Sequence, residues 1–172
     1  MGKVLIAYAT KLGTTADAAR HVAAAFKEAG RDVDVLPADE VTDLSGYESV
    51  VLGTAIRVGK PVAEAKHFVQ KHGKDLADIR TALFSIGLTM AEDTPENRAK
   101  ALSFLAPLVE TMHPVIVGVF AGRVDMERLP AIWRIFFSKE LKKEDSEMAR
   151  AMRLPLDWQP LDVWAREVAE KL

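Results

Sequence analysis

The sequence predicts a doubly wound α/β domain, in which helices cover both faces of a parallel sheet. Two observations indicate this fold class. Segments with strand and helix patterns alternate along the chain, and the strand segments are nearly continuous apolar runs. Strands buried on both faces have that composition, and parallel strands need crossover helices between them. A length of 172 residues suits one core, so we expect a single domain over residues 1–172.

The first strand, turn and helix are the clearest elements. Residues 4–9 form an apolar run typical of a buried strand, and residues 10–15 form a turn rich in threonine. Apolar residues then recur at helical spacing from Ala16 to Phe26, and we expect Gly30 to end this helix.

The remaining elements follow in alternation. We expect further strands over residues 33–38, 49–53, 80–86 and 114–121. We expect helices from Pro61 to about His72, from Thr94 to about Met112 with a break near Pro107, and from Asp162 to Leu172. Five strands in a doubly wound sheet predict the order 2-1-3-4-5.

Composition narrows the classes of function. A net charge of −2 gives no reason to expect a nucleic-acid partner. The chain has no cysteine, which excludes disulfides, thiolate zinc sites and cysteine-ligated iron–sulfur clusters, so a redox role needs a bound cofactor. We see no signal peptide and no apolar run of bilayer length, and we therefore expect a cytoplasmic protein.

The turn after the first strand is a candidate anion site. A hydroxyl-rich turn that opens a helix offers hydrogen-bond donors, and the helix dipole favours negative charge there. The turn is neither a Walker A loop nor a GxGxxG fingerprint, which argues against ATPase and NAD-enzyme functions. A plain strand–helix turn capped by threonine is the competing interpretation. The candidate phosphate-binding residues are Thr10, Lys11, Leu12, Gly13, Thr14 and Thr15.

Two further loops follow strands three and four of the predicted sheet. Because the carboxyl ends of parallel strands share one edge, we expect these loops to meet the first turn in space. The loop after strand three carries Arg57 and Lys60 and no acidic residue. Positive charge stabilises the anionic reduced form of a cofactor ring, which favours two-electron chemistry with a substrate. The alternative interpretation is that both are solvated surface charges. The candidate cofactor-binding residues here are Thr54, Ala55, Ile56, Arg57, Val58, Gly59, Ser85, Gly87, Leu88 and Thr89.

The segment Leu129–Lys143 is unusually aromatic and basic. As a helix it spreads apolar residues over more than half of its circumference, and residues 123–143 carry six basic and three acidic side chains. Such a helix suits an anionic membrane surface, a partner protein, the cofactor end of the sheet, or ordinary packing on its own domain. By contrast, the four histidines do not form a metal site, since His67 and His72 do not share a helix face.

These residues resemble the flavodoxin superfamily, and more closely its protoporphyrinogen IX dehydrogenase branch, over essentially the whole chain. The resemblance is carried by residues 3–10 with Gly13 and Thr15, by the string from Gly53 to Gly59, by Phe84-Ser85, by residues 121–125, and by Asp157-Trp158 with Trp164-Ala165. It implies a flavodoxin-like three-layer sandwich. The chain departs from the branch pattern at Met126 and at residues 153–156.

The resemblance also implies a function. It implies FMN, with its phosphate on residues 10–15 and its ring between the second and third loops, and a segment 126–156 that serves substrate or membrane access. It implies an oxidoreductase that passes electrons from a reduced substrate through FMN to a quinone or similar acceptor, with Arg57 tuning the flavin or orienting an acidic substrate. A flavodoxin-type electron carrier and a cofactor-free interaction domain remain alternatives.

Overall fold

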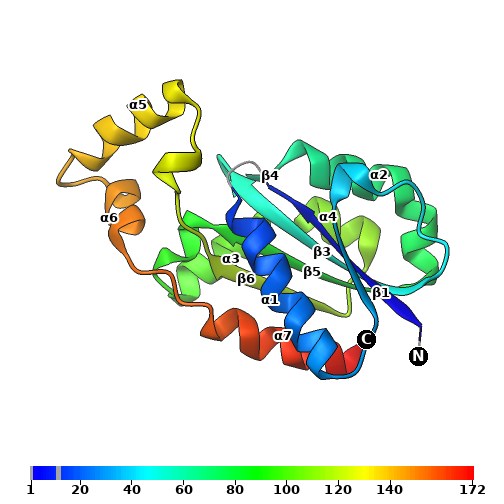
Figure 1. The fold of residues 1–172 in the computed structure, drawn as a ribbon. Helices are drawn as coiled ribbons and strands as arrows, with labels where there is room; N and C mark the ends of the chain where they lie inside the picture. Colours follow the sequence, from blue (N-terminus) through cyan, green and yellow to red (C-terminus); the bar gives the residue numbers. More distant parts are fainter. Residues whose placement is uncertain (1, 11–12) are drawn as a thin grey trace.

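The computed structural model describes residues 2–10 and 13–172. Its centre is a parallel sheet with strand order β2-β1-β3-β5-β6, and a short strand β4 pairs antiparallel with β3 (Figure 1). The five long strands correspond to the five predicted ones, so the predicted order is confirmed. The strands are β1 (Lys3–Ala9), β2 (Val33–Pro37), β3 (Tyr47–Arg57), β4 (Lys60–Pro61), β5 (Arg80–Gly87) and β6 (Ile116–Ala121).

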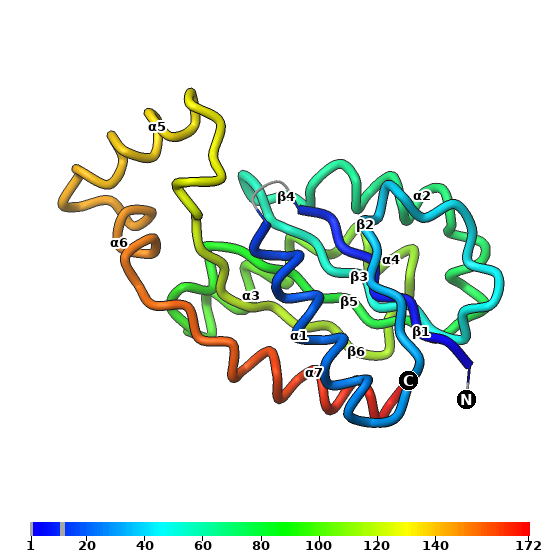
Figure 2. Tube along the Cα trace, in the orientation of Figure 1, coloured from blue at the N-terminus to red at the C-terminus, as the bar shows by residue number. Residues whose placement is uncertain are grey.

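Helices cover both faces of the sheet, as the apolar strand runs predicted (Figures 1 and 2). One face packs against α1 (Thr14–Glu28) and α7 (Gln159–Lys171), and the other packs against α2 (Ala63–Asp78), α3 (Pro95–Phe104) and α4 (Ala106–Met112). Short 3-10 turns lie at η1 (Ala38–Glu40), η2 (Leu88–Ala91) and η3 (Met126–Arg128).

Strand β1 shows why the strands are unbroken apolar runs. Leu5 and Ala7 point to the face covered by α2, whereas Val4 and Ile6 point to the face covered by α1. All four side chains are fully buried. Since successive side chains alternate between faces, a strand covered on both sides needs an apolar residue at every position.

The exit of β3 differs from the prediction. Residues 54–57 continue the strand rather than forming a loop, and the chain then reverses through Val58 and Gly59 into β4. Both turn residues have positive φ, 49° and 69°, as the two-residue hairpin turn requires. Pro61 therefore lies in β4, and the prediction that it starts a helix is wrong.

The other helix boundaries follow the predictions more closely. The predicted break near Pro107 is confirmed, since α3 ends at Phe104 and α4 begins at Ala106. Helix α2 runs to Asp78, past the predicted end at His72. Helix α7 begins at Gln159 rather than at Asp162.

Residues 123–156 leave the end of β6 and return to α7 only after two helices, α5 (Ala131–Leu141) and α6 (Glu147–Arg153). We call this stretch the roof segment, and Figure 2 shows its helix α5 projecting beyond the helices that cover the sheet. No residue of α5 is buried. The segment is anchored by two buried side chains, Leu129 before α5 and Ala149 in α6, and α6 lies against η2.

Candidate functional site

A cavity of about 430 Å³ lies where β1, β3, β5 and β6 end, and we call it the edge cavity. The three predicted loops meet there, as the sheet topology requires. Its ceiling comes from the roof segment, which contributes Trp133, Phe136 and Phe137 from α5 and Met148 from α6. The predicted cofactor residues that line it are Thr10, Thr14, Thr15, Ala55, Ile56, Arg57, Val58, Gly87 and Leu88.

Several predicted residues do not line the edge cavity. Thr54 and Ser85 are buried within β3 and β5, before the ends of these strands. Gly59 lies in the β3–β4 turn beside the ring of Phe104, and Gly13 and Thr89 adjoin the cavity without lining it. Lys11 and Leu12 lie outside the described residues.

The turn that opens α1 is built around Gly13. This residue is the N-cap of α1 with φ 86°, and it has no side chain with which to cap the first helical turn. Its backbone N–H donates to Thr10 Oγ1 at 3.0 Å. Thr14 Oγ1 donates to the carbonyl of Arg123 at 2.9 Å, so the hydroxyl of Thr14 joins this turn to the roof segment.

Arg57 joins the sheet to the ceiling of the cavity. Its guanidinium lies over the Trp133 ring, 4.3 Å from the ring centroid, which is within the range of a cation–π contact. Among the described residues, no carboxylate forms an ion pair with Arg57. The sequence placed Arg57 in the site, but it carried no signal that this side chain would reach a residue of the roof segment.

The charged side chains that line the edge cavity are all positive. Arg57 and Arg123 are the charged members of its described lining, and none of the described lining residues is acidic. The remaining walls are aliphatic or aromatic, apart from the three threonines. Apolar walls with a few cationic groups suit a flat conjugated ligand that carries negative charge.

The roof segment returns to α7 through the Asp157-Trp158 pair. The indole of Trp158 stacks on the ring of His21 with 4.8 Å between centroids, and His21 Nδ1 lies 2.9 Å from Asp162 Oδ1. Asp157 Oδ1 accepts from the backbone N–H of Gln159, the first residue of α7, at 2.9 Å. These contacts fix the end of the roof segment on α1 and α7.

No group of three or more histidine, aspartate or glutamate side chains within residues 2–10 and 13–172 is arranged to hold a metal ion. Over the same residues, no helix has both the length and the apolar character needed to cross a bilayer.

Comparison with known proteins agrees with this geometry. A family model described as a flavodoxin domain matches residues 5–150. The chain belongs to the flavodoxin-domain family. Among curated proteins, the protoporphyrinogen IX dehydrogenase (quinone) of Escherichia coli strain K12 is 28% identical over 173 residues, covering 97% of this chain and 94% of that protein. The enzyme of the same name from Leishmania major is 28% identical over 129 residues, covering 73% of this chain and 55% of that protein.

Solved flavodoxins have the same fold. An archaeal flavodoxin superposes with a TM-score of 0.56 at 15% identity, covering 98% of this chain and 97% of its own. A cysteine-to-serine mutant of the Pseudomonas aeruginosa flavodoxin gives 0.57 at 15% identity, with 99% and 98% covered. At these identities the likeness concerns the fold. The predicted flavodoxin-like three-layer architecture is confirmed.

Proposed function

We propose that this flavodoxin-domain protein binds FMN in the edge cavity and is an oxidoreductase that passes electrons from a reduced substrate to a quinone or similar acceptor. The observation that carries the proposal is the cavity itself, which joins the uncapped turn of α1 to an apolar chamber under an aromatic ceiling. The near full-length similarity to a protoporphyrinogen IX dehydrogenase supports the same class of reaction.

The donor set of the site fits this cofactor. The first turn of α1 offers backbone N–H groups and the helix dipole to a phosphate, and Thr10 and Thr15 add hydroxyl groups on the same side. The chamber between Ile56 and Leu88 is apolar and suits the face of a conjugated ring. When bound, FMN supplies reversible transfer of one or two electrons, chemistry that no side chain of this cysteine-free protein provides.

The residues of the site have separate tasks in this proposal. Arg57 places positive charge at one end of the chamber, where it favours an acidic substrate group or negative charge on a reduced ring. Trp133, Phe136 and Phe137 exclude water and offer flat surfaces to a second aromatic ligand. No side chain is required as a general acid or base, because the protein positions the ligands and the cofactor carries the chemistry.

A flavodoxin-type electron carrier is the second candidate, and one observation favours it. Val58 lines the cavity yet is 92% exposed, so one edge of a bound ring would be open to a protein partner. A carrier of this kind has no small-molecule substrate and exchanges electrons by contact with other redox proteins.

Anaerobic reduction distinguishes the two candidates. The FMN-loaded protein is mixed first with protoporphyrinogen IX and then with a menaquinone analogue, and the visible flavin absorbance is followed. The oxidoreductase proposal predicts bleaching by the first compound and recovery with the second, with both rates lowered in Arg57→Ala. Absorbance that ignores both compounds but responds to a reduced redox protein supports the carrier and contradicts the proposal.

A further inference from the structure

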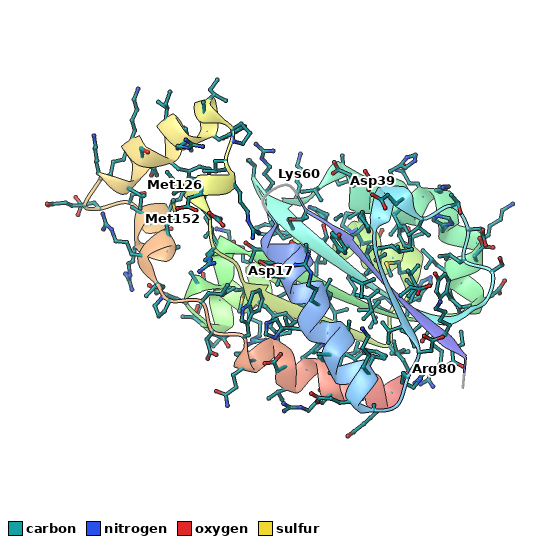
Figure 3. The ribbon with its side chains drawn as sticks, in the orientation of Figure 1. Asp17, Asp39, Lys60, Arg80, Met126 and Met152 are labelled. Atoms are coloured by element: carbon teal, nitrogen blue, oxygen red, sulfur yellow. The ribbon has the colours of Figure 1, made fainter. Side chains whose placement is uncertain are left out.

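Arg128 of η3 is a side chain of the roof segment that reaches the turn of α1. Arg128 lies two residues after Met126, and its Nη1 lies 3.7 Å from Oδ2 of Asp17 in the first turn of α1. Figure 3 labels Met126 and Asp17 on these two elements. A Cβ atom built on Gly13 would collide with Nη1 of Arg128. The guanidinium therefore occupies the space above the N-cap that a side chain at position 13 would fill.

Two ion pairs orient the guanidinium of Arg128 but leave some of its N–H donors without a close acceptor. Its Nε lies 3.3 Å from Asp125 Oδ2, and its Nη1 lies 3.7 Å from Asp17 Oδ2. Both distances are longer than the roughly 2.7–2.9 Å typical of a charge-assisted hydrogen bond. Asp17 has a much closer partner in Arg20, at 2.7 Å. A guanidinium has five N–H donors, so several of those on Arg128 remain available to a further anion.

The start of α1, beside Arg128, suits a phosphate group. Gly13 leaves the start of α1 without a side-chain cap, and the helix dipole places partial positive charge there. The arginine side chain is 55% exposed, and its Nη1 already lies where a Cβ atom of residue 13 would be, so it can meet an anion at this turn. Two independent features, the open helix start and the guanidinium packed against it, thus converge on one position.

We propose that Arg128 is a phosphate-binding residue of the FMN site, contributed by the roof segment, so that binding of the phosphate also fastens that segment over the cavity. This inference rests on the proposed function. The sequence did not single out Arg128, because the phosphate-binding candidates were all in the turn itself. A planar guanidinium forms paired hydrogen bonds to two phosphate oxygens, which a threonine hydroxyl cannot do.

The test compares FMN with riboflavin, which has the same ring and ribityl chain but no phosphate. Dissociation constants are measured by quenching of flavin fluorescence for wild type, Arg128→Ala and Arg128→Lys. We expect Arg128→Ala to weaken FMN binding by about tenfold or more, as for loss of a hydrogen bond between charged groups. Riboflavin binding should not change, and Arg128→Lys should recover part of the loss.

Arg150→Ala is the matched control. Arg150 lies in the same segment and forms an ion pair with Glu92 that joins α6 to the end of η2, away from the turn of α1. Its removal should change FMN and riboflavin binding by the same factor. If Arg128→Ala weakens both ligands equally, or weakens neither, Arg128 does not bind phosphate. A wild-type protein that binds neither flavin would overturn the proposed function and this inference together.

Discussion

The sheet and the roof segment use aromatic residues in opposite ways. Phe26 and Phe84 lie between the sheet and its helices and are fully buried, and Phe84 packs edge-on against Trp164. In α5, Trp133 and Phe136 remain 39% and 48% exposed although they pack on each other. The same residue types thus complete a core in one region and leave a surface uncovered in the other.

The two regions therefore contribute differently to stability and to ligand binding. Burial of aromatic surface in the sheet stabilises the fold directly, at about 25 cal/mol per Å² of apolar area removed from water. The aromatic residues of α5 gain little by that route, because none of them is buried. Their contribution should appear when a ligand fills the edge cavity.

The largest effect should come from truncating the core. Phe26→Ala removes a fully buried ring from the packing of α1 on the sheet and should lower the free energy of unfolding by about 3–5 kcal/mol. Phe136→Ala should lower it by less than about 1 kcal/mol, because that ring is half exposed. Urea unfolding of both variants without ligand checks the comparison, and equal losses would contradict it.

The next effect concerns ligand binding rather than stability. Trp133→Ala removes both the cation–π partner of Arg57 and part of the cavity ceiling. We expect riboflavin and FMN affinities to fall together by about tenfold, since an aromatic contact of this size is worth about 1–2 kcal/mol. Trp133→Phe should retain most of the affinity. Unchanged binding of both flavins in Trp133→Ala would remove the roof segment from the site.

The same contrast between regions shows what the sequence could predict. The strands were recognisable because burial on both faces requires local apolar runs, and their order followed from the alternation with helices. The extension of β3 to Arg57 was missed, because residues 54–57 carry no apolar run and the hairpin turns at Val58, a β-branched residue that rarely adopts φ 49°.

The sequence predicted which loops meet at the edge cavity, but not which side chain of each loop lines it. Thr54 and Ser85 lie inside the sheet because the exact end of a strand decides which residues face the cavity. The contact of Arg57 with Trp133 joins residues far apart in the chain, and no local pattern encodes it. Of the four interpretations of the segment Leu129–Lys143, the structure bears on one, since Trp133, Phe136 and Phe137 line the edge cavity at the carboxyl ends of the strands.

We expect a smaller effect of pH on the stability of the fold, and it comes from His72 in α2, which packs on the sheet. Burial lowers the pKa of His72, which packs on Phe68. A hydrogen bond with the Val41 backbone opposes this shift, as do Asp75 and Asp43, whereas the nearby Lys71 acts in the same direction as burial. The folded state therefore binds this proton less readily than the unfolded state. Stability should be full above the ordinary pKa of about 6.5 and should fall as pH decreases below it.

Urea unfolding between about pH 7 and pH 5 tests this expectation against His72→Leu, which should flatten the profile. Asp34 and Glu48, whose pKa values are lowered in the fold, affect the pH dependence of stability only in more acidic solution. Their stabilisation is lost as the pH falls below their ordinary pKa values of about 4. If the free energy of unfolding of His72→Leu changes with pH as steeply as that of the wild type, groups other than His72 cause the pH dependence.

The smallest effect concerns the outer side of α5. Ile132 and Ile135 are 74% and 59% exposed, and the basic residues Lys139, Lys142 and Lys143 follow them. If this surface meets an anionic membrane, Ile132→Ser with Ile135→Ser should lower co-sedimentation with anionic liposomes. Val163→Ser is the control, since Val163 is 56% exposed on α7. Equal sedimentation of all three proteins would exclude a membrane role for α5.

The central claim is that the edge cavity under the roof segment holds a flavin. Titration of the purified apoprotein with FMN, followed by flavin and tryptophan fluorescence, tests it most directly. We predict saturable binding of one FMN per chain with strong quenching of both signals, and a smaller loss of tryptophan emission in Trp133→Phe. A protein that stays colourless and leaves the emission of added FMN unchanged would contradict the account.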